Sequence, residues 1–184
     1  MPPRAGGLPR QLIVLLHGVG ADGNDLIALA PVLAERLPDA AFVAPDAPEP
    51  CDVAPFGRQW FSLRERRPEA LLLGVQAVAP VVDAFLDAEL ERHRLADHQL
   101  ALVGFSQGAM TALYVAPRRP RALAGVLGFS GALLGGERLA PEAQSRPPVY
   151  LVHGDADEVV PVEATYAAVA GLQAAGIPVQ WSIR

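Results

Sequence analysis

The sequence has no lysine, one cysteine and no uninterrupted apolar run of 18 residues. Without lysine, the chain can form neither the phosphate-binding lysine of a P-loop nor a lysine Schiff base. Cys51 alone excludes an internal disulfide and a cysteine-based zinc cluster. The short apolar runs predict no membrane-spanning helix, and Leu12 to Leu16 are too few for the core of a signal peptide. We therefore expect a cytoplasmic protein.

Basic side chains are fewer than acidic ones. The 15 arginines and 20 acidic residues give a formal net charge of −5, which favours neither a nucleic-acid partner nor an anionic membrane surface. At 184 residues, with 51% apolar and 19% charged residues, the chain is long and apolar enough for one buried core. We expect a single domain over residues 1–184. Composition leaves the oligomeric state open, a homodimer included.

Short apolar runs alternate with helix-like stretches along the chain. The sequence predicts strands at 11–16, 41–46, 99–104, 122–129, 148–153 and 178–183, and helices at 25–36, 69–94, 106–116 and 161–175. The strands are almost continuously apolar, which is typical of strands covered on both faces. This alternation predicts an α/β fold with a mostly parallel sheet and helices on both faces. Sites in such sheets lie at the carboxyl ends of the strands.

The predicted strand at 99–104 ends in GFSQG, and the helix-like AMTALYVA follows at once. G-x-S-x-G between a strand and a helix is the nucleophile elbow of hydrolases. A strained turn would lift the Ser106 hydroxyl to the sheet edge, while Gly104 and Gly108 would let strand and helix approach closely. The helix N-terminus favours a developing negative charge. Ser106 is therefore the candidate nucleophile; the alternative is an ordinary serine in a glycine-rich turn.

The first predicted strand ends in the glycine-rich HGVGADGND. In this architecture the first such loop and the residue after the nucleophile each provide a backbone N–H for the oxyanion. Val19 and Gln107 are thus the candidate donors, and their side chains are not the working groups. The segment GVGADG also fits the G-x-G-x-x-G spacing of a dinucleotide-binding loop, with Asp46 roughly placed as its acidic residue. A nucleotide-binding module therefore stays open as an alternative.

The predicted strand at 148–153 ends in HGDADEVVP, which puts Asp155 and Asp157 at the same sheet edge. A nucleophilic serine followed by an acid is the chain order of this hydrolase architecture. The acid orients the catalytic imidazole and stabilises it when it is protonated. Asp155 fits a role in structuring the loop better. We choose Asp157 as the catalytic acid.

Five segments together carry a family resemblance: LLHGVGADGNDL, GRQWFSL, LVGFSQGAM, GFSGAL and VHGDADEVVP. They resemble the phospholipase/carboxylesterase family, which includes the acyl-protein thioesterases, over about residues 11–181, and are most similar to its bacterial carboxylesterases. The resemblance implies an α/β-hydrolase fold without a large cap. It also implies hydrolysis of acyl esters or thioesters by a Ser–His–Asp triad through an acyl-enzyme, with no metal or organic cofactor. It matches Ser106 and Asp157 to the triad, Val19 and Gln107 to the oxyanion hole, and Trp60 to the border of the acyl pocket.

The family's histidine has no match in this sequence, since none of the residues after Asp157 is histidine. We expect His17 and His153 to structure their loops, and His93 and His98 to be solvated. We therefore expect the natural chain to continue beyond residue 184 and to carry the histidine there. A fragment would also lack a final helix and expose the apolar surface that this helix covers. The alternative is a non-catalytic binding protein or an inactive truncated fragment.

Apolar side chains near the motifs are candidate walls of the acyl pocket. Trp60 and Phe61 follow GRQ, and Leu133 and Leu134 follow GFSGA. For all four the alternative is packing in the core. The polar, proline-rich stretch 135–148 is expected to be a surface loop bordering the pocket.

Overall fold

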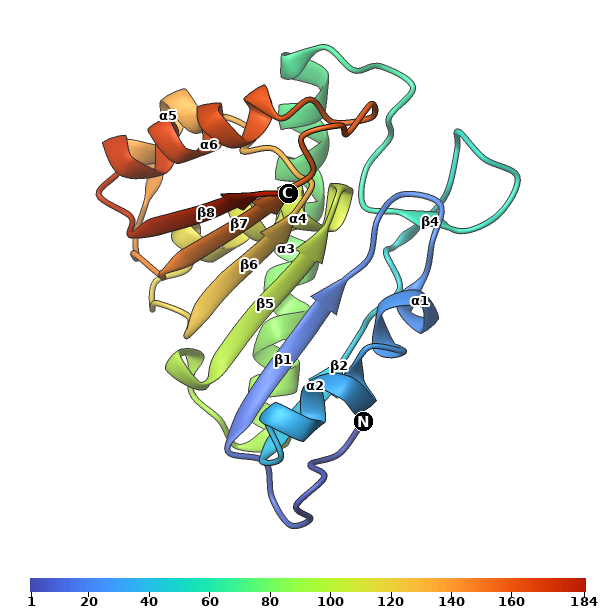
Figure 1. Ribbon diagram of the computed structural model, residues 1–184, viewed down its shortest axis with the longest axis vertical. Helices are drawn as coiled ribbons and strands as arrows, with labels where there is room; N and C mark the ends of the chain where they lie inside the picture. Colours follow the sequence, from blue (N-terminus) through green and yellow to red (C-terminus); the bar gives the residue numbers. More distant parts are fainter.

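The computed structural model describes residues 1–184, and its centre is a six-stranded, fully parallel sheet (Figure 1). Across the sheet the strands are β2 (Ala40–Val43), β1 (Gln11–Leu16), β5 (Leu100–Phe105), β6 (Gly125–Phe129), β7 (Val149–His153) and β8 (Val179–Ile183). All five pairs of neighbouring strands are parallel, which confirms the predicted α/β class. β2 ends earlier than expected, since Pro45 cannot donate to a strand ladder.

The remaining elements lie between these strands. They are α1 (Gly23–Ile27), α2 (Ala30–Arg36), β3 (Glu49–Pro50), β4 (Arg58–Gln59), α3 (Pro68–His93), η1 (Asp97–Gln99), α4 (Gln107–Val115), η2 (Ala116–Arg118), α5 (Gly136–Glu142) and α6 (Glu163–Ala174). The predicted helix 25–36 is two helices, because the chain breaks ahead of Pro31 in the first turn of α2. The stretch 135–148, which we expected to be a loop throughout, is a loop only after residue 142. It contains α5, which buries Leu139 completely and packs on α6.

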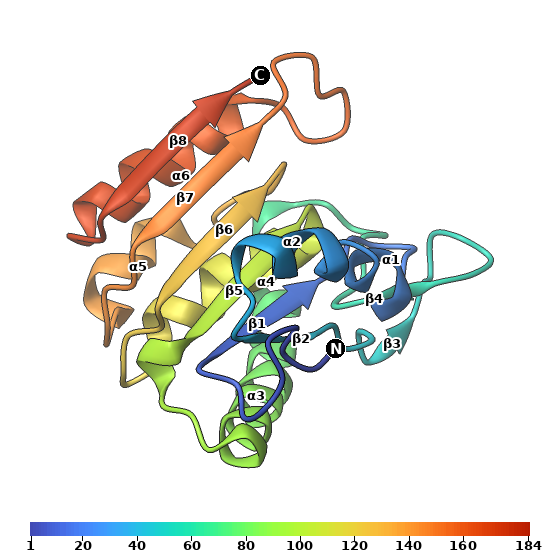
Figure 2. The ribbon, with the colours of Figure 1, turned by 60° about the horizontal axis from the view of Figure 1, so that its bottom comes forward.

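The sheet has one well-covered face and one partly covered face (Figures 1 and 2). α3 to α6 cover the first face and enclose the main core of 30 buried residues. α1 and α2 lie over β1 and β2 on the other face, where a second cluster includes Ile13, Leu15 and Phe42. Alternate residues of β1 therefore enter different cores, since Leu12 and Val14 point to the first face. Burial on both sides explains why this strand is continuously apolar.

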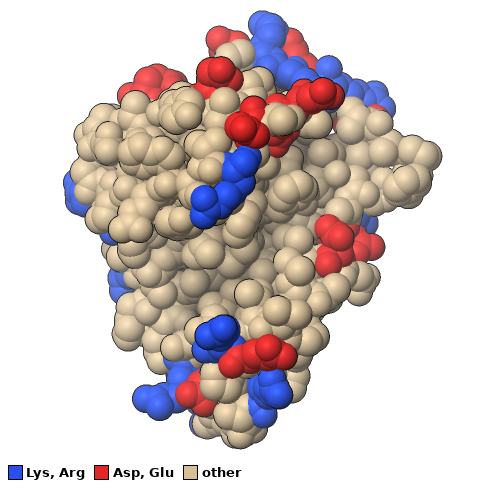
Figure 3. All heavy atoms as spheres, viewed as in Figure 1, with Lys and Arg blue, Asp and Glu red and all other residues tan.

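Strands β5 to β7 are not covered by helices on the second face. Residues paired between neighbouring parallel strands share a face, so the strand register places one apolar set there: Ala101, Val103, Phe105, Leu127, Phe129, Tyr150 and Val152. Phe105 is 46% exposed and Leu127 is 37% exposed. Few charged side chains interrupt this face in the space-filling view (Figure 3). The structure thus has an exposed apolar sheet surface.

The helix α3 has the length and composition of a membrane-spanning helix, with a mean hydropathy of 1.6 over its most apolar window. A core helix of a soluble fold meets the same criteria. Val75, Val78, Val82, Leu86 and Leu90 recur at helical spacing and belong to the main core. Packing in the main core therefore accounts for the apolar residues on one side of α3, whereas Leu73 and Val81 on the same helix are exposed.

Candidate active site

Ser106 occupies a strained turn between β5 and α4. Its φ and ψ are 51° and −115°, outside the usual regions for a residue with a side chain. Its N–H donates to the Phe129 carbonyl on the neighbouring strand at 2.8 Å, which ties the turn to the sheet edge. A Cβ at Gly108 would stand 2.0 Å from the Leu16 carbonyl oxygen, and one at Gly104 would stand 2.5 Å from the backbone of Ala109. The two glycines therefore permit the close packing that the motif predicts.

The glycine-rich loop after β1 lies against this turn. A Cβ built on Gly18 would be 3.5 Å from Ser106 Cβ and 3.1 Å from the Phe105 ring. The Val19 N–H donates to no backbone carbonyl, and Gln107 begins α4, so its N–H has no partner within the helix. The loop that carries the Val19 N–H and the first residue of α4 thus both adjoin the serine. This arrangement suits stabilisation of an oxyanion on a group attacked by Ser106.

The side chain of Gln107 is fully buried and contacts the segment after β4. Its Oε1 accepts the Trp60 backbone N–H at 2.9 Å, and its Nε2 donates to the Phe61 carbonyl at 2.6 Å. The Trp60 indole Nε1–H in turn donates to the His17 carbonyl at 2.9 Å, directly before the glycine loop. Sequence analysis assigned Gln107 through its N–H alone and missed the role of its side chain. No local pattern indicates it, because the partners lie 46 and 47 residues away.

Asp157 lies in the loop after β7, with its side chain 18% exposed. Its Oδ1 accepts the N–H groups of Val159 and Val160, each at 2.9 Å, and its Oδ2 lies 3.5 Å from His153 Nε2. The N–H of Val160 above all holds the pKa of Asp157 below its usual range, against the opposing effect of burial. The N–H of Val159, the Ser130 side chain and His153 add to this lowering. The carboxylate is therefore ionised at neutral pH and held in a fixed orientation.

Ser130 lies near the acid, and sequence analysis assigned no role to it. It follows β6 with φ 47° and donates its N–H to the Val152 carbonyl at 2.9 Å. Its side chain is close enough to Asp157 to favour the charged carboxylate. Its segment GFSGAL contributed to the resemblance. A non-glycine residue with positive φ at the end of a central strand is the structural signal that marks it.

The four histidines do not supply a base to Ser106. His17 is fully buried; its Nε2 accepts the Ala47 N–H and its Nδ1 contacts the Gly18 carbonyl. His153 is 1% exposed, with its ring nitrogens 2.7 Å from Thr165 Oγ1 and the Val160 carbonyl. Both rings thus structure loops, as predicted. His93 lies on α3 near Glu89, and His98 precedes β5, at the strand end opposite Ser106.

The glycine-rich loop after β1 does not fit the nucleotide-binding alternative, because the acidic residue proposed for the ribose already contacts this loop. Asp46 Oδ1 accepts the Gly23 N–H at 2.9 Å, and Asp22 caps the five-residue α1. The acid that would hold a ribose is therefore engaged with the glycine loop itself. In addition, α1 has five residues and is shorter than the helix that usually follows a dinucleotide-binding loop.

The candidate pocket walls are mainly core residues. Trp60 and Phe61 are each 4% exposed, and Leu134 is 8% exposed; all three belong to the main core, while Leu133 packs against it. One edge of Trp60 borders a cavity of about 90 Å³. A larger cavity of about 300 Å³ opens at the carboxyl ends of β5 to β7 on the partly covered face. Its lining includes Phe105, Phe129, Ser130 and Arg184.

Comparison with known proteins identifies the family of the chain. The family model described as Phospholipase/Carboxylesterase matches residues 5–182. The chain belongs to the phospholipase/carboxylesterase family. It is 29% identical to Esterase YpfH of Escherichia coli over 91% of this chain and 70% of that protein. It is also 29% identical to Acyl-protein thioesterase 1 of Saccharomyces cerevisiae, over 83% and 73%. The crystal structure of esterase PE8 superposes with a TM-score of 0.95 and 44% identity, covering 100% of this chain and 86% of that one.

Membership in the phospholipase/carboxylesterase family confirms the resemblance and makes the protein a hydrolase of the carboxylic-ester type. It also fixes the fold as that of an α/β-hydrolase, and no large cap domain interrupts the elements of this chain. This membership speaks against the alternative interpretation of the chain as a nucleotide-binding module.

Proposed function

We propose that the protein hydrolyses acyl esters or thioesters through a covalent acyl-enzyme on Ser106, acting as one α/β-hydrolase domain. The observation that carries this proposal is the strained serine at the start of α4, with the glycine-rich loop after β1 packed against it. A serine lifted out of the sheet edge can attack a carbonyl carbon. The N–H groups of Val19 and Gln107 then receive the negative charge that develops on the carbonyl oxygen. The substrate class agrees with relatives that are named esterases and acyl-protein thioesterases.

Asp157 serves in this proposal as the acid of a Ser–His–Asp triad. The lowered pKa keeps its carboxylate charged, as required of a group that orients and stabilises an imidazolium. We propose that the histidine comes from residues that follow Arg184. Two findings support this: the Asp155 N–H donates to the Arg184 carbonyl at 2.8 Å, so the chain reaches Arg184 beside the acid loop, and the chain spans 86% of esterase PE8.

The proposed reaction then follows from these positions. The histidine takes the Ser106 proton while Oγ attacks the acyl carbon, and the oxyanion lies between the two N–H donors. Collapse of this intermediate expels the alcohol or thiol, which receives the proton from the histidine. Water attacks the acyl-enzyme in the same way and releases the carboxylic acid. Trp60 remains the proposed residue beside the acyl group, and the cytoplasm remains the predicted location.

The test combines a serine-directed fluorophosphonate with intact mass measurement on the natural full-length chain. We expect a starting mass above 19.4 kDa, one adduct on Ser106, and hydrolysis of p-nitrophenyl butyrate. Ser106→Ala should stay folded and lose both the adduct and the turnover. Comparable turnover by Ser106→Ala would refute the nucleophile. A mass of 19.4 kDa without an adduct would instead support a non-catalytic binding protein.

A further inference from the structure

We infer that the Gln107 side chain is a positioning residue that holds the two halves of the oxyanion hole in register, acting through residues 57–61. We call residues 57–61 the strap. This inference rests on the proposed function of Val19 and Gln107 as oxyanion donors. It adds a role for the carboxamide, which touches neither the substrate nor the reacting atoms.

The first half of the link joins the nucleophile turn to the strap. Gln107 sends its carboxamide to the Trp60 N–H and the Phe61 carbonyl, at 2.9 and 2.6 Å. The side chain is fully buried, and both ends of the amide are paired. Removing the carboxamide would leave the Trp60 N–H and the Phe61 carbonyl without these hydrogen bonds. The strap is therefore fixed relative to the residue whose own N–H faces the oxyanion.

The second half joins the strap to the glycine loop after β1. Arg58 exchanges two backbone hydrogen bonds with this loop, accepting the Gly20 N–H and donating to the Ala21 carbonyl, each at 2.8 Å. The Trp60 indole adds the hydrogen bond to the His17 carbonyl at 2.9 Å. A Cβ at Gly57 would stand 2.0 Å from the Gly20 carbonyl oxygen, so strap and loop are in direct contact. Val19 lies between these anchored positions.

The link matters because the two donors come from segments far apart in the sequence. An oxyanion hole works only if both N–H groups point at one place, and a shift of about 1 Å can lower a rate about 100-fold. The β1–β5 pairing fixes the strands, but the loop continues beyond the last paired residues, Leu16 and Gly104. Beyond that point the strap adds hydrogen bonds to the close approach of Gly18 to Phe105 and Ser106, and the Gln107 side chain secures the strap on the nucleophile side.

The chain offers a closely matched control. Gln99 also bridges two backbone groups, accepting the Ala96 N–H at 3.1 Å and donating to the Arg10 carbonyl at 3.0 Å. It precedes β5, at the end of the strand opposite Gln107. The Gln99 hydrogen bonds are exposed whereas Gln107 is fully buried, so Gln99→Met controls for loss of a bridging glutamine, and thermal unfolding compares the stability of the two variants.

The experiment compares Gln107→Met, Gln107→Glu and Gln99→Met with the full-length protein, using folded samples checked by thermal unfolding. We expect both Gln107 variants to lower kcat for p-nitrophenyl butyrate about 10- to 100-fold, with KM changed less than about threefold. Affinity for an alkylboronic acid, which forms a tetrahedral adduct with serine, should fall with kcat/KM. Gln99→Met should keep its kcat.

Hydrogen exchange of residues 17–22 and 57–61 provides a readout that needs no turnover. We expect faster exchange of both segments in Gln107→Met and unchanged exchange in Gln99→Met. Unchanged exchange in Gln107→Met, or an equal loss of kcat in Gln99→Met, would overturn the inference. If the full-length wild type neither reacts with fluorophosphonate nor hydrolyses the ester, the proposed function fails. The exchange data then still decide whether Gln107 holds the loop.

Discussion

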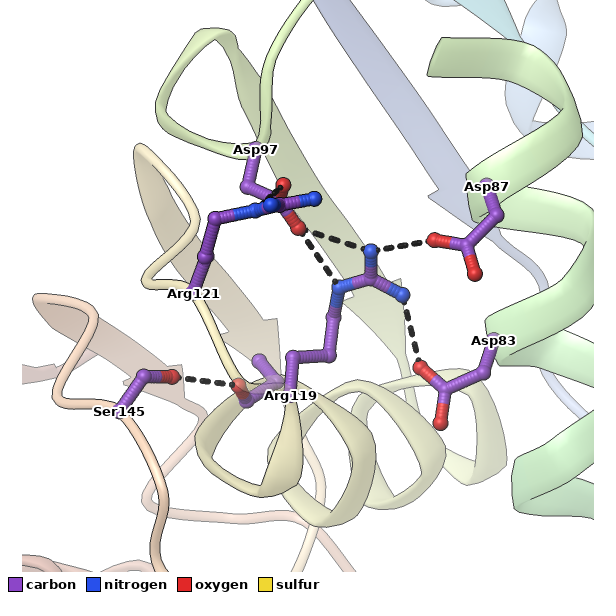
Figure 4. Close-up of polar contacts among 7 residues, drawn as sticks. Asp83, Asp87, Asp97, Arg119, Arg121 and Ser145 are labelled. Atoms are coloured by element: carbon purple, nitrogen blue, oxygen red, sulfur yellow. Dashed lines mark hydrogen bonds and ion pairs between the residues drawn. The ribbon is translucent and has the colours of Figure 1, made fainter. Parts of the chain in front are cut away.

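The sharpest prediction about stability concerns Arg119, which lies between two carboxylates on α3 and Asp97, just before β5 (Figure 4). The guanidinium is 4% exposed and contacts Asp83, Asp87 and Asp97 at 2.8, 2.6 and 2.8 Å. Arg121 reaches the other oxygen of Asp97 at 2.7 Å. Arg119→Met keeps a side chain of similar length but removes the charge, and it leaves Asp97, itself 3% exposed, with one partner.

The structure sets the size of the effect. Removing one partner of a buried ion pair costs about 3–5 kcal/mol, because a charge stays buried without compensation. Arg121 retains its contact with Asp97, so we expect the lower end, about 3 kcal/mol of unfolding free energy. For a chain of this length that corresponds to a fall in Tm of about 6–12 °C. Arg4→Ala is the control: Arg4 and Glu35 are both exposed and 3.9 Å apart, so its loss should stay below about 0.5 kcal/mol.

The pH dependence distinguishes an electrostatic cause from lost packing. Burial opposes the charge on Asp97, but hydrogen bonds from Arg119 and Arg121 outweigh it and hold the pKa of Asp97 below its usual range. A lowered folded pKa contributes stability above the unfolded pKa of about 3.9 that is lost as the pH falls. In Arg119→Met the balance shifts towards burial and the folded pKa rises. The loss of unfolding free energy in Arg119→Met therefore grows as the pH rises. The difference in unfolding free energy between Arg119→Met and the unsubstituted protein shrinks as the pH falls.

The assay is urea unfolding of both proteins at about pH 7.5 and about pH 3.5, followed by circular dichroism. We expect the larger difference in unfolding free energy at the higher pH. A difference below about 1 kcal/mol at both values would refute the buried-charge argument. An equal difference at both values would assign the effect to packing of the arginine stem instead.

Two further substitutions test the site. Gly108→Ala would place a Cβ 2.0 Å from the Leu16 carbonyl oxygen and should lower the unfolding free energy, measured in urea, by about 3 kcal/mol or more. The control is Gly154→Ala, whose Cβ would meet no atom within 4 Å and should change the unfolding free energy by less than about 0.5 kcal/mol. Similar losses in both variants would contradict the close approach at the nucleophile turn. Asp157→Asn should lower kcat about 10³- to 10⁴-fold in ester hydrolysis, and Asp155→Asn less than about tenfold; the reverse ranking would move the acid to Asp155.

Much of the fold could be predicted because its signals are local. Continuous apolar runs and helical spacing placed all six strands of the sheet and the long helix α3 to within a few residues. α5 could not be predicted in this way, because its sequence GERLAPE has Leu139 as its one large apolar residue and contains a proline. Contact with α6 and burial of that one leucine stabilise it. The two-residue strands β3 and β4 likewise depend on pairing with each other rather than on their own composition.

The candidate site also contains some residues that local motifs predict and others that depend on contacts between distant segments. Ser106, Val19 and the Gln107 N–H follow from short motifs whose geometry is set by neighbouring residues. The structure places the loop that carries Val19 against Ser106, and the catalytic roles stay predictions. The contacts of the Gln107 side chain and of Ser130 join segments that a motif does not connect. Local patterns carry no information on such pairs, since each residue looks ordinary in its own segment.

The strain at the nucleophile is sustained by contacts between strand ends rather than within the turn. Ser106 and Ser130 have φ values of 51° and 47° and end neighbouring strands. Ser106 donates to the carbonyl before Ser130, and Ser130 donates to the β7 carbonyl of Val152. At the next strand the Arg184 N–H donates to the His153 carbonyl at 2.9 Å. Each strand end is thus held by the one beside it. Because a strained residue persists only where its surroundings fix it, the geometry of Ser106 depends on the whole carboxyl edge of the sheet as far as β8.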